Sequence, residues 1–306
     1  MQSKFIWMDG ELVPYEQATV HFLTPSLHYG VSIFEGLRCY KTDRGAAVFR
    51  LREHIQRFLD SAHIMGIREN PYTLEELRQA IFDTIRANGF AKCYIRPLMY
   101  LDGPLGLKLD KARPVVGIAV WEWETYHGEK ALDQGLRMVV SSYTRMHPNI
   151  NMTKAKVAGN YVNSMLAKTD ALRMGFDEVI MLDQSGFVAE SSGMNLFMVR
   201  GGSIYTPARA AILEGITRDA VITLIGDLGY PLIEEPISRD QLYVADEIFL
   251  CGTAAEVVPV REIDFRQIGA GSMGPVTKIV QDAFFEVVRG DGGTRSSEWL
   301  DYVPPD

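Results

Sequence analysis

One polar stretch constrains the fold of this 306-residue chain more than any other feature. The stretch ETYHGEKALDQG, residues 124–135, has no apolar periodicity and separates two parts that each combine strand patterns with helix patterns. A segment of this kind is typical of a linker, and the chain is long enough to build two hydrophobic cores. The sequence therefore predicts an α/β (α+β) fold with two domains: a small α/β domain at 1–123, the linker at 124–135 and a larger domain at 136–306.

The first part begins with a hairpin pattern and continues with two helix patterns. KFIWMDGELV predicts a β-hairpin that turns at Asp9 and Gly10. Apolar residues recur on one stripe over 51–65, which predicts an amphipathic helix. A second helix is predicted over 73–89, where Thr73 and Glu76 form a capping box and Gly89 ends the helix. Strands are predicted at 46–51, 91–101 and 114–123.

The second part is richer in short strands. Strands are predicted at 136–143, 178–184, 186–191, 195–200, 203–207 and 246–260, and helices at 163–175, 215–229 and 275–288. The tail after Arg289 is rich in glycine and is expected to be loosely held.

Composition excludes several classes of partner. Acidic residues outnumber basic ones 39 to 31, which gives a net charge of −8 and no bulk attraction to nucleic acid or anionic membranes. The three cysteines lie far apart, which argues against a disulfide framework or a zinc site and fits a reducing cytoplasm. The six histidines show no metal-ligand spacing, so no metal is expected. Neither a signal peptide nor a membrane-spanning stretch is evident.

A glycine motif near the end of the chain raises the possibility of a nucleotide site. Gly269, Gly271 and Gly274 form G-x-G-x-x-G and open a helix. Such a fingerprint needs a following strand with an acidic residue about 20 residues on, and here only a helix and a polar tail follow. A tight turn with Pro275 at the first helical position is the favoured interpretation, and a nucleotide-binding oxidoreductase is the less favoured one.

Two lysines in NMTKAKVAGNY, residues 151–161, raise a question of chemistry. A lysine amine forms a Schiff base with a carbonyl if burial favours its neutral form. Lys156 lies among small residues that would let a flat cofactor approach, whereas Lys154 has a more polar setting and is expected to be solvated. On this stretch alone a surface charge is the favoured interpretation of Lys156, because most lysines are surface charges.

Other stretches offer what a phosphorylated pyridine cofactor needs. Glu190 ends a strand and could keep a ring nitrogen protonated. Gly215, Ile216 and Thr217 open a helix whose N-terminus suits a phosphate, although Thr217 could be a plain N-cap. Arg57 could reach a phosphate, or could be a surface cation near Glu53 or Asp60.

Together these motifs resemble the class IV, fold-type IV pyridoxal-phosphate aminotransferases, and among them the branched-chain amino acid aminotransferases. The resemblance extends from HYGVSIFEGLRCY at 28–40 to GPVTKIVQDAFF at 274–285, through REHIQRFLDSA, YIRP, KVAGNY, AESSGMNLF, EGITRD and CGTAAEVVPV. It implies a small N-terminal α/β domain, a larger C-terminal domain with a mixed sheet or pseudo-barrel, and pyridoxal 5'-phosphate as cofactor.

The resemblance also implies roles for the residues that would hold this cofactor. Lys156 resembles the Schiff-base lysine, Tyr161 the tyrosine at the ring oxygen, and Glu190 the partner of the ring nitrogen. The phosphate cup would comprise Arg57, Gly215, Ile216, Thr217 and Thr253, with Leu213 packing on the ring. The chain departs from the family at Met194, where an acidic residue is common, and only local repacking is expected there.

On the substrate side, Tyr94 and Arg96 lie two apart on a strand and so share a face. This Tyr-x-Arg pair resembles the branched-chain group. The other residues that resemble substrate contacts are Phe34, Gly36, Trp123 and Tyr126 in the side-chain pocket, Thr253 and Ala254 in the GTAAE turn, and Tyr29, Leu107 and Leu109 as parts supplied across a dimer interface.

The implied activity is a ping-pong transamination that moves the amino group of leucine, isoleucine or valine to 2-oxoglutarate, in a homodimer or larger homo-oligomer. A D-amino acid or (R)-amine transaminase, or a lyase of the same fold, stays open as an alternative, since these would share Lys156 and differ around Tyr94 and Arg96.

Overall fold

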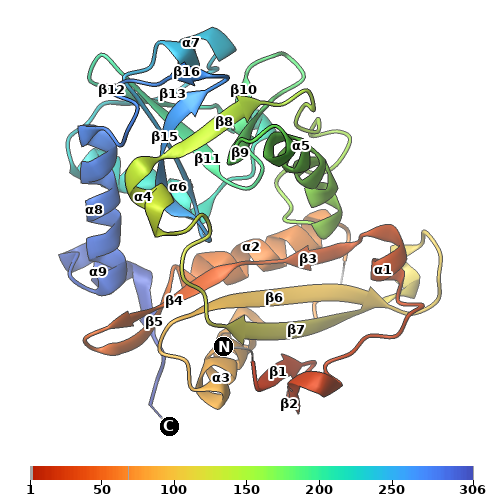
Figure 1. The fold of residues 1–306 in the computed structure, drawn as a ribbon. Coiled ribbons are helices and arrows are strands. Elements are labelled where there is room, and N and C mark those ends of the chain that lie inside the picture. Colours follow the sequence, from red (N-terminus) through yellow and green to blue (C-terminus); the bar gives the residue numbers. More distant parts are fainter. Residues whose placement is uncertain (1–2, 68, 306) are drawn as a thin grey trace. The chain divides into compact units, whose positions relative to one another are not determined.

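A computed structural model describes residues 3–67 and 69–305 of the chain. The chain forms two compact units, each built from strands and helices, which confirms the predicted α/β fold class (Figure 1). The first unit comprises Met1–Glu124, Ala155–Gly159 and Val287–Asp306, and the second comprises Thr125–Lys154 and Asn160–Glu286. Two segments from the second half of the sequence thus belong to the first unit.

An eight-stranded sheet forms the first unit, and every strand pairing among its described residues is antiparallel. The strand order is β17-β5-β4-β6-β7-β1-β2, and β3 pairs with β6. The elements are β1 (Phe5–Met8), β2 (Glu11–Pro14), α1 (Pro25–Tyr29), β3 (Ser32–Phe34), β4 (Leu37–Thr42), β5 (Gly45–Phe49), α2 (Leu51–Ile64), α3 (Leu74–Asn88), β6 (Cys93–Asp102), β7 (Arg113–Trp121), α9 (Gly293–Trp299) and β17 (Leu300–Tyr302).

Local signals in the sequence account for the ends of several of these elements. Asp9 and Gly10 turn the β1–β2 hairpin with positive φ angles of 48° and 106°, as expected. Thr73 Oγ1 accepts a hydrogen bond from the amide of Glu76, and the Glu76 carboxylate accepts one from the amide of Thr73. This capping box starts α3, and Gly89 ends it with a φ of 71°.

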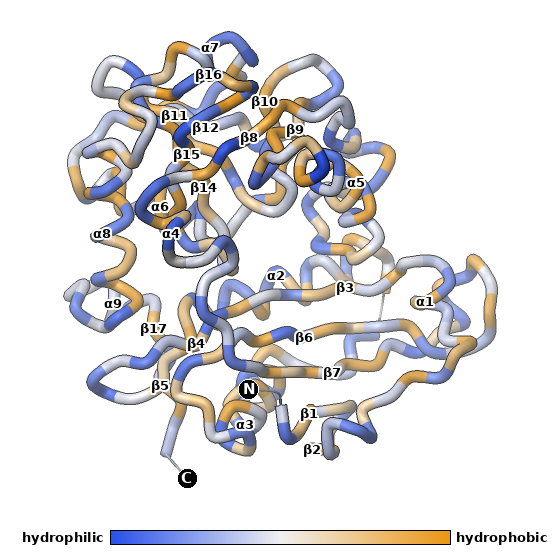
Figure 2. The backbone as a smooth tube through the Cα atoms, in the orientation of Figure 1, coloured by the Kyte–Doolittle hydropathy of each residue, from blue (hydrophilic) through white to orange (hydrophobic). Residues whose placement is uncertain are grey.

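The core of the first unit lies between the sheet and the helices α2 and α3. Phe58 of α2 and Ile81 of α3 are buried in one cluster with Ile95 of β6 and Ile118 of β7. Apolar residues run along the strands of the sheet, whereas the helices alternate apolar and polar residues (Figure 2). This pattern fixes which face of α2 is turned inward and which is left to polar groups.

The second unit is built on a nine-stranded mixed sheet in the order β10-β9-β8-β15-β14-β11-β12-β13, with β16 on β15. The pairs β8–β9, β8–β15 and β12–β13 are parallel. The elements are α4 (Glu129–Gln134), β8 (Leu136–Val140), α5 (Tyr161–Arg173), β9 (Glu178–Leu182), β10 (Val188–Ser191), β11 (Asn195–Arg200), β12 (Ser203–Thr206), α6 (Ile216–Asp227), β13 (Leu232–Glu234), α7 (Arg239–Tyr243), β14 (Glu247–Gly252), β15 (Glu256–Ile263), β16 (Arg266–Gln267) and α8 (Pro275–Arg289), whose last residues belong to the first unit.

The expectation of a loosely held tail was wrong. After Arg289 the chain forms α9 and then β17, which pairs with β5. Trp299 is buried, its carbonyl accepts a hydrogen bond of 2.7 Å from the amide of Arg50, and its ring packs edge-on against Phe49. The glycine content of the tail suggested mobility, but Trp299 near its end fixes the tail to the first unit. The stretch predicted as a linker also contains a short helix, α4.

The G-x-G-x-x-G motif forms a turn whose anion site the chain itself fills. Both oxygens of the Glu247 carboxylate accept hydrogen bonds at the start of α8, from the amides of Val276 at 3.0 Å and Thr277 at 2.7 Å. A Cβ on Gly274 would lie 2.0 Å from that carboxyl group, so glycine is required for this approach. Because a carboxylate already occupies the helix N-terminus, the motif offers no place for a nucleotide phosphate.

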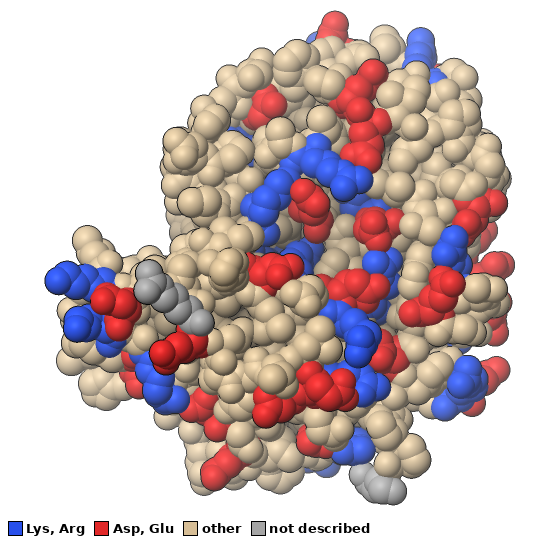
Figure 3. Space-filling view, turned by 180° about the vertical axis from the view of Figure 1, so that it is seen from behind, with Lys and Arg blue, Asp and Glu red and all other residues tan. Residues whose placement is uncertain are grey.

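The surface carries charges of both signs. On the face shown in Figure 3, acidic and basic side chains are intermingled. None of the helices in the described ranges is both long and apolar enough to cross a membrane.

Candidate active site

In the first unit, one face of α2 carries three polar residues at helical spacing, His54, Arg57 and Ser61. Glu35, which follows β3, is fully buried against the first two. The Arg57 guanidinium donates two hydrogen bonds to its carboxylate, from Nε at 2.6 Å and from Nη2 at 2.9 Å, and His54 Nδ1 donates a third at 2.7 Å. Glu35 therefore fixes the orientation of the Arg57 guanidinium.

The charge states of this cluster follow from its contacts. Burial raises the pKa of Glu35, but the Arg57 guanidinium and the His54 hydrogen bond outweigh it and hold that pKa well below its ordinary range. Burial is also the main cause that lowers the pKa of His54, so its imidazole is neutral near pH 7. The cluster thus combines one carboxylate, one guanidinium and a neutral donor.

The short segment Ala155–Gly159 lies in the first unit and positions Lys156. The Lys156 carbonyl accepts a hydrogen bond of 3.1 Å from the amide of Phe34, and its amide donates one of 3.0 Å to Ser61 Oγ. The same serine hydroxyl donates to the carbonyl of Arg57 at 2.7 Å. Lys156 is half-buried, and its Nζ lies 4.9 Å from the centre of the Phe34 ring. The backbone of the lysine is therefore anchored directly to the helix that carries Arg57.

A second cation of the first unit, Arg96, is surrounded by aromatic rings. Its guanidinium carbon lies 4.7 Å from the ring centre of Phe34, 5.5 Å from that of Tyr94 and 6.0 Å from that of Trp121. Its Nη2 donates a hydrogen bond of 3.4 Å to the Tyr94 hydroxyl. Its Nε is buried without a hydrogen-bond partner, and no carboxylate of residues 3–67 and 69–305 forms an ion pair with it. The arrangement leaves a caged cation suited to an incoming anion.

Gly36 is required by the packing of Tyr94. A Cβ at position 36 would lie 1.9 Å from the Tyr94 hydroxyl, which no side chain tolerates. The Tyr94 ring in turn packs at 5.1 Å from Trp121 and 5.2 Å from Trp123. Gly36 thus makes room for the tyrosine that contacts Arg96.

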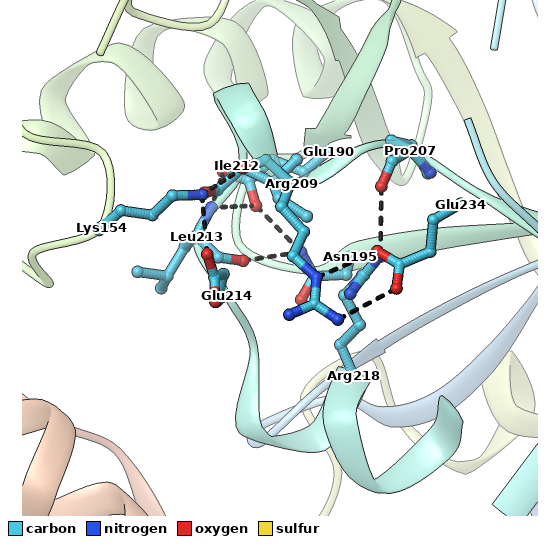
Figure 4. A network of polar contacts seen from close by, with 10 residues as sticks. All are labelled: Lys154, Glu190, Asn195, Pro207, Arg209, Ile212, Leu213, Glu214, Arg218 and Glu234. Atoms are coloured by element: carbon cyan, nitrogen blue, oxygen red, sulfur yellow. Dashed lines mark hydrogen bonds and ion pairs between the residues drawn. The ribbon is translucent and has the colours of Figure 1, made fainter. Parts of the chain in front are cut away.

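In the second unit, the buried carboxylate of Glu190 is held by three groups. Arg145 Nε lies 2.7 Å from Oε1 in an ion pair, and Oε2 accepts hydrogen bonds of 3.2 Å from Asn195 Nδ2 and from the amide of Leu213. Asn195 Nδ2 also donates to the Leu213 carbonyl at 3.1 Å, so both polar groups of Leu213 are engaged (Figure 4). A carboxylate fixed in this way is suited to stabilise a protonated ring nitrogen.

The N-terminus of α6 is shaped to receive an anion. Gly215 is its N-cap, and no side chain caps the helix. A Cβ on Gly215 would lie 2.1 Å from Asn195 Oδ1, so glycine is needed here as well. Ile216 and Thr217 form the first, buried turn, where amides and helix dipole favour a phosphate. Thr253 and Ala254 are half-buried in the turn that follows β14.

The remaining predicted residues lie in varied places. Tyr161 is the half-buried first residue of α5, and the Tyr126 hydroxyl accepts a hydrogen bond of 3.0 Å from Lys168 Nζ. Tyr29 and Leu107 are exposed, Leu107 by 85%, whereas Leu109 packs against the core of the first unit. Met194 is buried in the core of the second unit. The roles assigned to these residues stay predictions.

Sequence reasoning missed several residues that hold these groups in place. Glu35 stands within the HYGVSIFEGLRCY stretch and follows the predicted Phe34, so its position was a usable signal. Trp121 could have been found from the pairing of β6 with β7, which sets it opposite Tyr94. Arg145 carries no local pattern, because its contact with Glu190 joins chain segments far apart in sequence. Asn195 lies five residues after Glu190 in the AESSGMNLF stretch, so its position was a usable signal.

The donor set matches the groups of pyridoxal 5'-phosphate. In the first unit, Lys156 could supply an amine for the aldehyde and Arg57 a donor for the phosphate. In the second unit, Glu190 could pair with the ring nitrogen, and the uncapped start of α6 could bind a phosphate. These are the complementary chemistries that each part of the cofactor needs, so the residues fit it.

Comparison with known proteins gives a consistent result. The sequence model of the family described as amino-transferase class IV matches residues 32–263. The branched-chain-amino-acid aminotransferase of Pseudomonas aeruginosa is 49% identical over 299 residues, which cover 97% of each chain. Crystal structures of the T.th. branched-chain amino acid aminotransferase are 46% identical and cover 99% of both chains. Their TM-scores are 0.94 for the complex with N-(5'-phosphopyridoxyl)-L-glutamate and 0.93 for the complex with 4-methylvaleric acid.

Proposed function

Since the chain belongs to the class IV aminotransferases, we propose that it moves the amino group of L-leucine, L-isoleucine or L-valine to 2-oxoglutarate, with pyridoxal 5'-phosphate as cofactor. The products are the branched-chain 2-oxo acid and L-glutamate. The two ligands of the T.th. enzyme support this pair of substrates, because one contains glutamate and the other has a branched apolar chain.

Each half of the reaction needs a proton to leave one carbon and reach another. Pyridoxal phosphate, when bound, supplies an electron sink that makes the Cα proton of the amino acid acidic. Lys156 Nζ anchors the cofactor and acts as the base that takes up this proton and returns it in the reverse direction. Glu190 holds the ring nitrogen protonated, while Arg57 and the amides at the start of α6 bind the phosphate.

The caged guanidinium of Arg96 carries the substrate assignment. One pocket must accept the apolar side chain of leucine and the distal carboxylate of glutamate in successive half-reactions. Aromatic rings bury methyl groups well, but a carboxylate left among them without a partner is costly. Arg96 suits both substrates. The aromatic rings around it can pack against the methyl groups of leucine, and its guanidinium can pair with the distal carboxylate of glutamate.

Arg96→Met tests this assignment. The glutamate half-reaction should slow by about 100-fold, since a charge-assisted contact is worth roughly 1.5–3 kcal/mol and the carboxylate is left unpaired. The leucine half-reaction should change by less than about fivefold. Single-turnover absorbance of the cofactor follows each half-reaction separately. Arg113→Met, at an exposed ion pair with Asp9 in the same sheet, serves as the control. Equal losses in both half-reactions would show that Arg96 instead serves the shared α-carboxylate or the pocket structure.

Transamination of D-amino acids or (R)-amines is the main alternative, and a lyase activity of the same fold is another. Tyr94 and Arg96, together with the branched-chain relatives, favour L-branched substrates. A panel of L-leucine, L-isoleucine, L-valine, D-alanine and (R)-1-phenylethylamine against 2-oxoglutarate separates these possibilities directly.

Assembly and location complete the proposal. A homodimer or larger homo-oligomer is supported by the exposed apolar side chains of Phe22, Leu27, Tyr29 and Leu107 in the first unit. The cysteines are all buried as free thiols, which fits the reducing cytoplasm expected from the sequence.

A further inference from the structure

Lys154, expected from the sequence to be a solvated charge, is engaged by three acceptors in the second unit. Its Nζ donates to the carbonyl of Ile212 at 3.0 Å and to the carbonyl of Arg209, and lies 3.2 Å from Glu214 Oε1 (Figure 4). An ammonium group has three N–H donors, so the number of acceptors matches its capacity. The side chain is still 37% exposed, so the expected solvation holds in part, but the sequence did not reveal these three contacts.

The three acceptors all belong to residues 209–214, which lead into α6. We call these residues the 209–214 segment. Two other residues contact this segment at Leu213. Glu190 accepts a hydrogen bond from the Leu213 amide, and Asn195 donates one to the Leu213 carbonyl. At its start, the Arg209 guanidinium pairs with Glu234 at 3.1 Å. Lys154 thus binds the same short segment that contacts the buried carboxylate of Glu190.

The position of Lys154 in the sequence gives this contact its meaning. Lys154 stands two residues before Lys156. The same short stretch of chain therefore carries both the amine and the cation that contacts the 209–214 segment. Leu213 and the N-cap Gly215 are both within or directly after that segment. A shift of the 209–214 segment would move the Leu213 amide away from Glu190 and displace the start of α6.

We propose that Lys154 is a positioning residue for the cofactor: its ammonium fixes the 209–214 segment so that Leu213 and the first turn of α6 keep the geometry that binds it. The inference rests on the proposed function, since it concerns the same cofactor. Lys154 takes no part in proton transfer, because all three of its donors are directed to the 209–214 segment.

Lys154→Met removes the ammonium while keeping a long apolar side chain. Cofactor should dissociate about tenfold faster from the holoenzyme during dialysis. The reason is that two carbonyls lose a charged donor, which water replaces only in part at this partly exposed site. Limited trypsin digestion should cleave after Arg209 several times faster, since this bond lies in the released segment. Lys278→Met, which removes an exposed i,i+4 pair with Asp282, is the matched control and should change neither measurement.

Two further variants keep the test informative if the methionine variant folds poorly. Lys154→Arg retains the charge but replaces three diverging donors with a planar group, so retention and cleavage should fall between those of the wild type and Lys154→Met. Glu214→Gln should have a small effect, because Glu214 is 51% exposed and the two carbonyl contacts remain.

Wild-type cofactor retention together with wild-type cleavage after Arg209 in Lys154→Met would overturn the inference. So would faster cofactor loss without faster cleavage, since the effect would then not pass through the 209–214 segment. Borohydride reduction of the wild-type holoenzyme distinguishes this failure from a failure of the proposed function. A label on Lys156 leaves the proposed function standing, whereas a holoenzyme that takes up no label on Lys156 removes the basis of both.

Discussion

At the scale of single residues, Arg57, which we propose binds the phosphate, is held in place by the carboxylate of Glu35. Glu35 is fully buried and occupies two donors of Arg57, so the guanidinium is held in one orientation before any ligand arrives. This ordering is achieved in the folded protein, and binding does not have to supply it. Glu35 also neutralises Arg57, which is itself 14% exposed, and so allows a guanidinium to be placed among apolar core residues.

We expect Glu35→Gln to destabilise the protein by about 3–5 kcal/mol, because it leaves the Arg57 charge buried beside a neutral amide. Urea unfolding of the cofactor-saturated protein measures this loss. Glu53→Gln removes a 41% exposed partner of Arg50 on the same helix and should cost about 1 kcal/mol or less. A similar small loss in both variants would mean that Glu35 contributes no more than a surface pair.

At the scale of elements, the sequence predicted what neighbouring residues decide. The turn at Asp9 and Gly10 and the capping box of Thr73 and Glu76 depend on residues within four positions, so their patterns were readable. The pairing of Arg145 with Glu190 and the pairing of β17 with β5 join segments that the sequence separates widely, and no local pattern marks either. The predicted site residues came from family motifs, and their supporting contacts came only with the structure.

The C-terminal elements give a direct test of that long-range pairing. Trp299→Ala should destabilise the protein by about 3–5 kcal/mol, since it empties a buried aromatic site between Phe49 and Arg50. Thermal and urea unfolding would show the loss. The adjacent Glu298→Ala, at an exposed position of α9, should stay within about 0.5 kcal/mol of the wild type. A neutral Trp299→Ala would restore the expectation of a loosely held tail.

At the scale of the whole molecule, histidines with a lowered pKa make stability depend on pH, and the partly buried His127 is one of them. Burial and the nearby Lys168 lower the pKa of His127 from 6.5 to about 4. The unfolded chain therefore binds more protons than the folded one between these values, so stability is complete above pH 6.5 and is lost as the pH falls toward 4. The loss from this group is on the order of 2 kcal/mol at about pH 5.

His127→Gln removes that titration. Its free energy of unfolding, measured in urea at about pH 7 and about pH 5, should fall less between the two values than that of the wild type. His21→Gln, at an exposed position of the first unit, should keep the wild-type pH dependence. An unchanged difference between the two pH values in His127→Gln would show that another group governs acid sensitivity.

The return of the chain's last residues to the first sheet affects how the protein can be made. A ribosome releases β5 (Gly45–Phe49) long before β17 (Leu300–Tyr302), so one edge of β5 stays unpaired until β17 emerges. An open strand edge is where one growing chain can pair with another. The first half of the protein is thus synthesised first, but its sheet is completed only when β17 pairs with β5. Until then, a neighbouring chain can pair with the open edge of β5 instead.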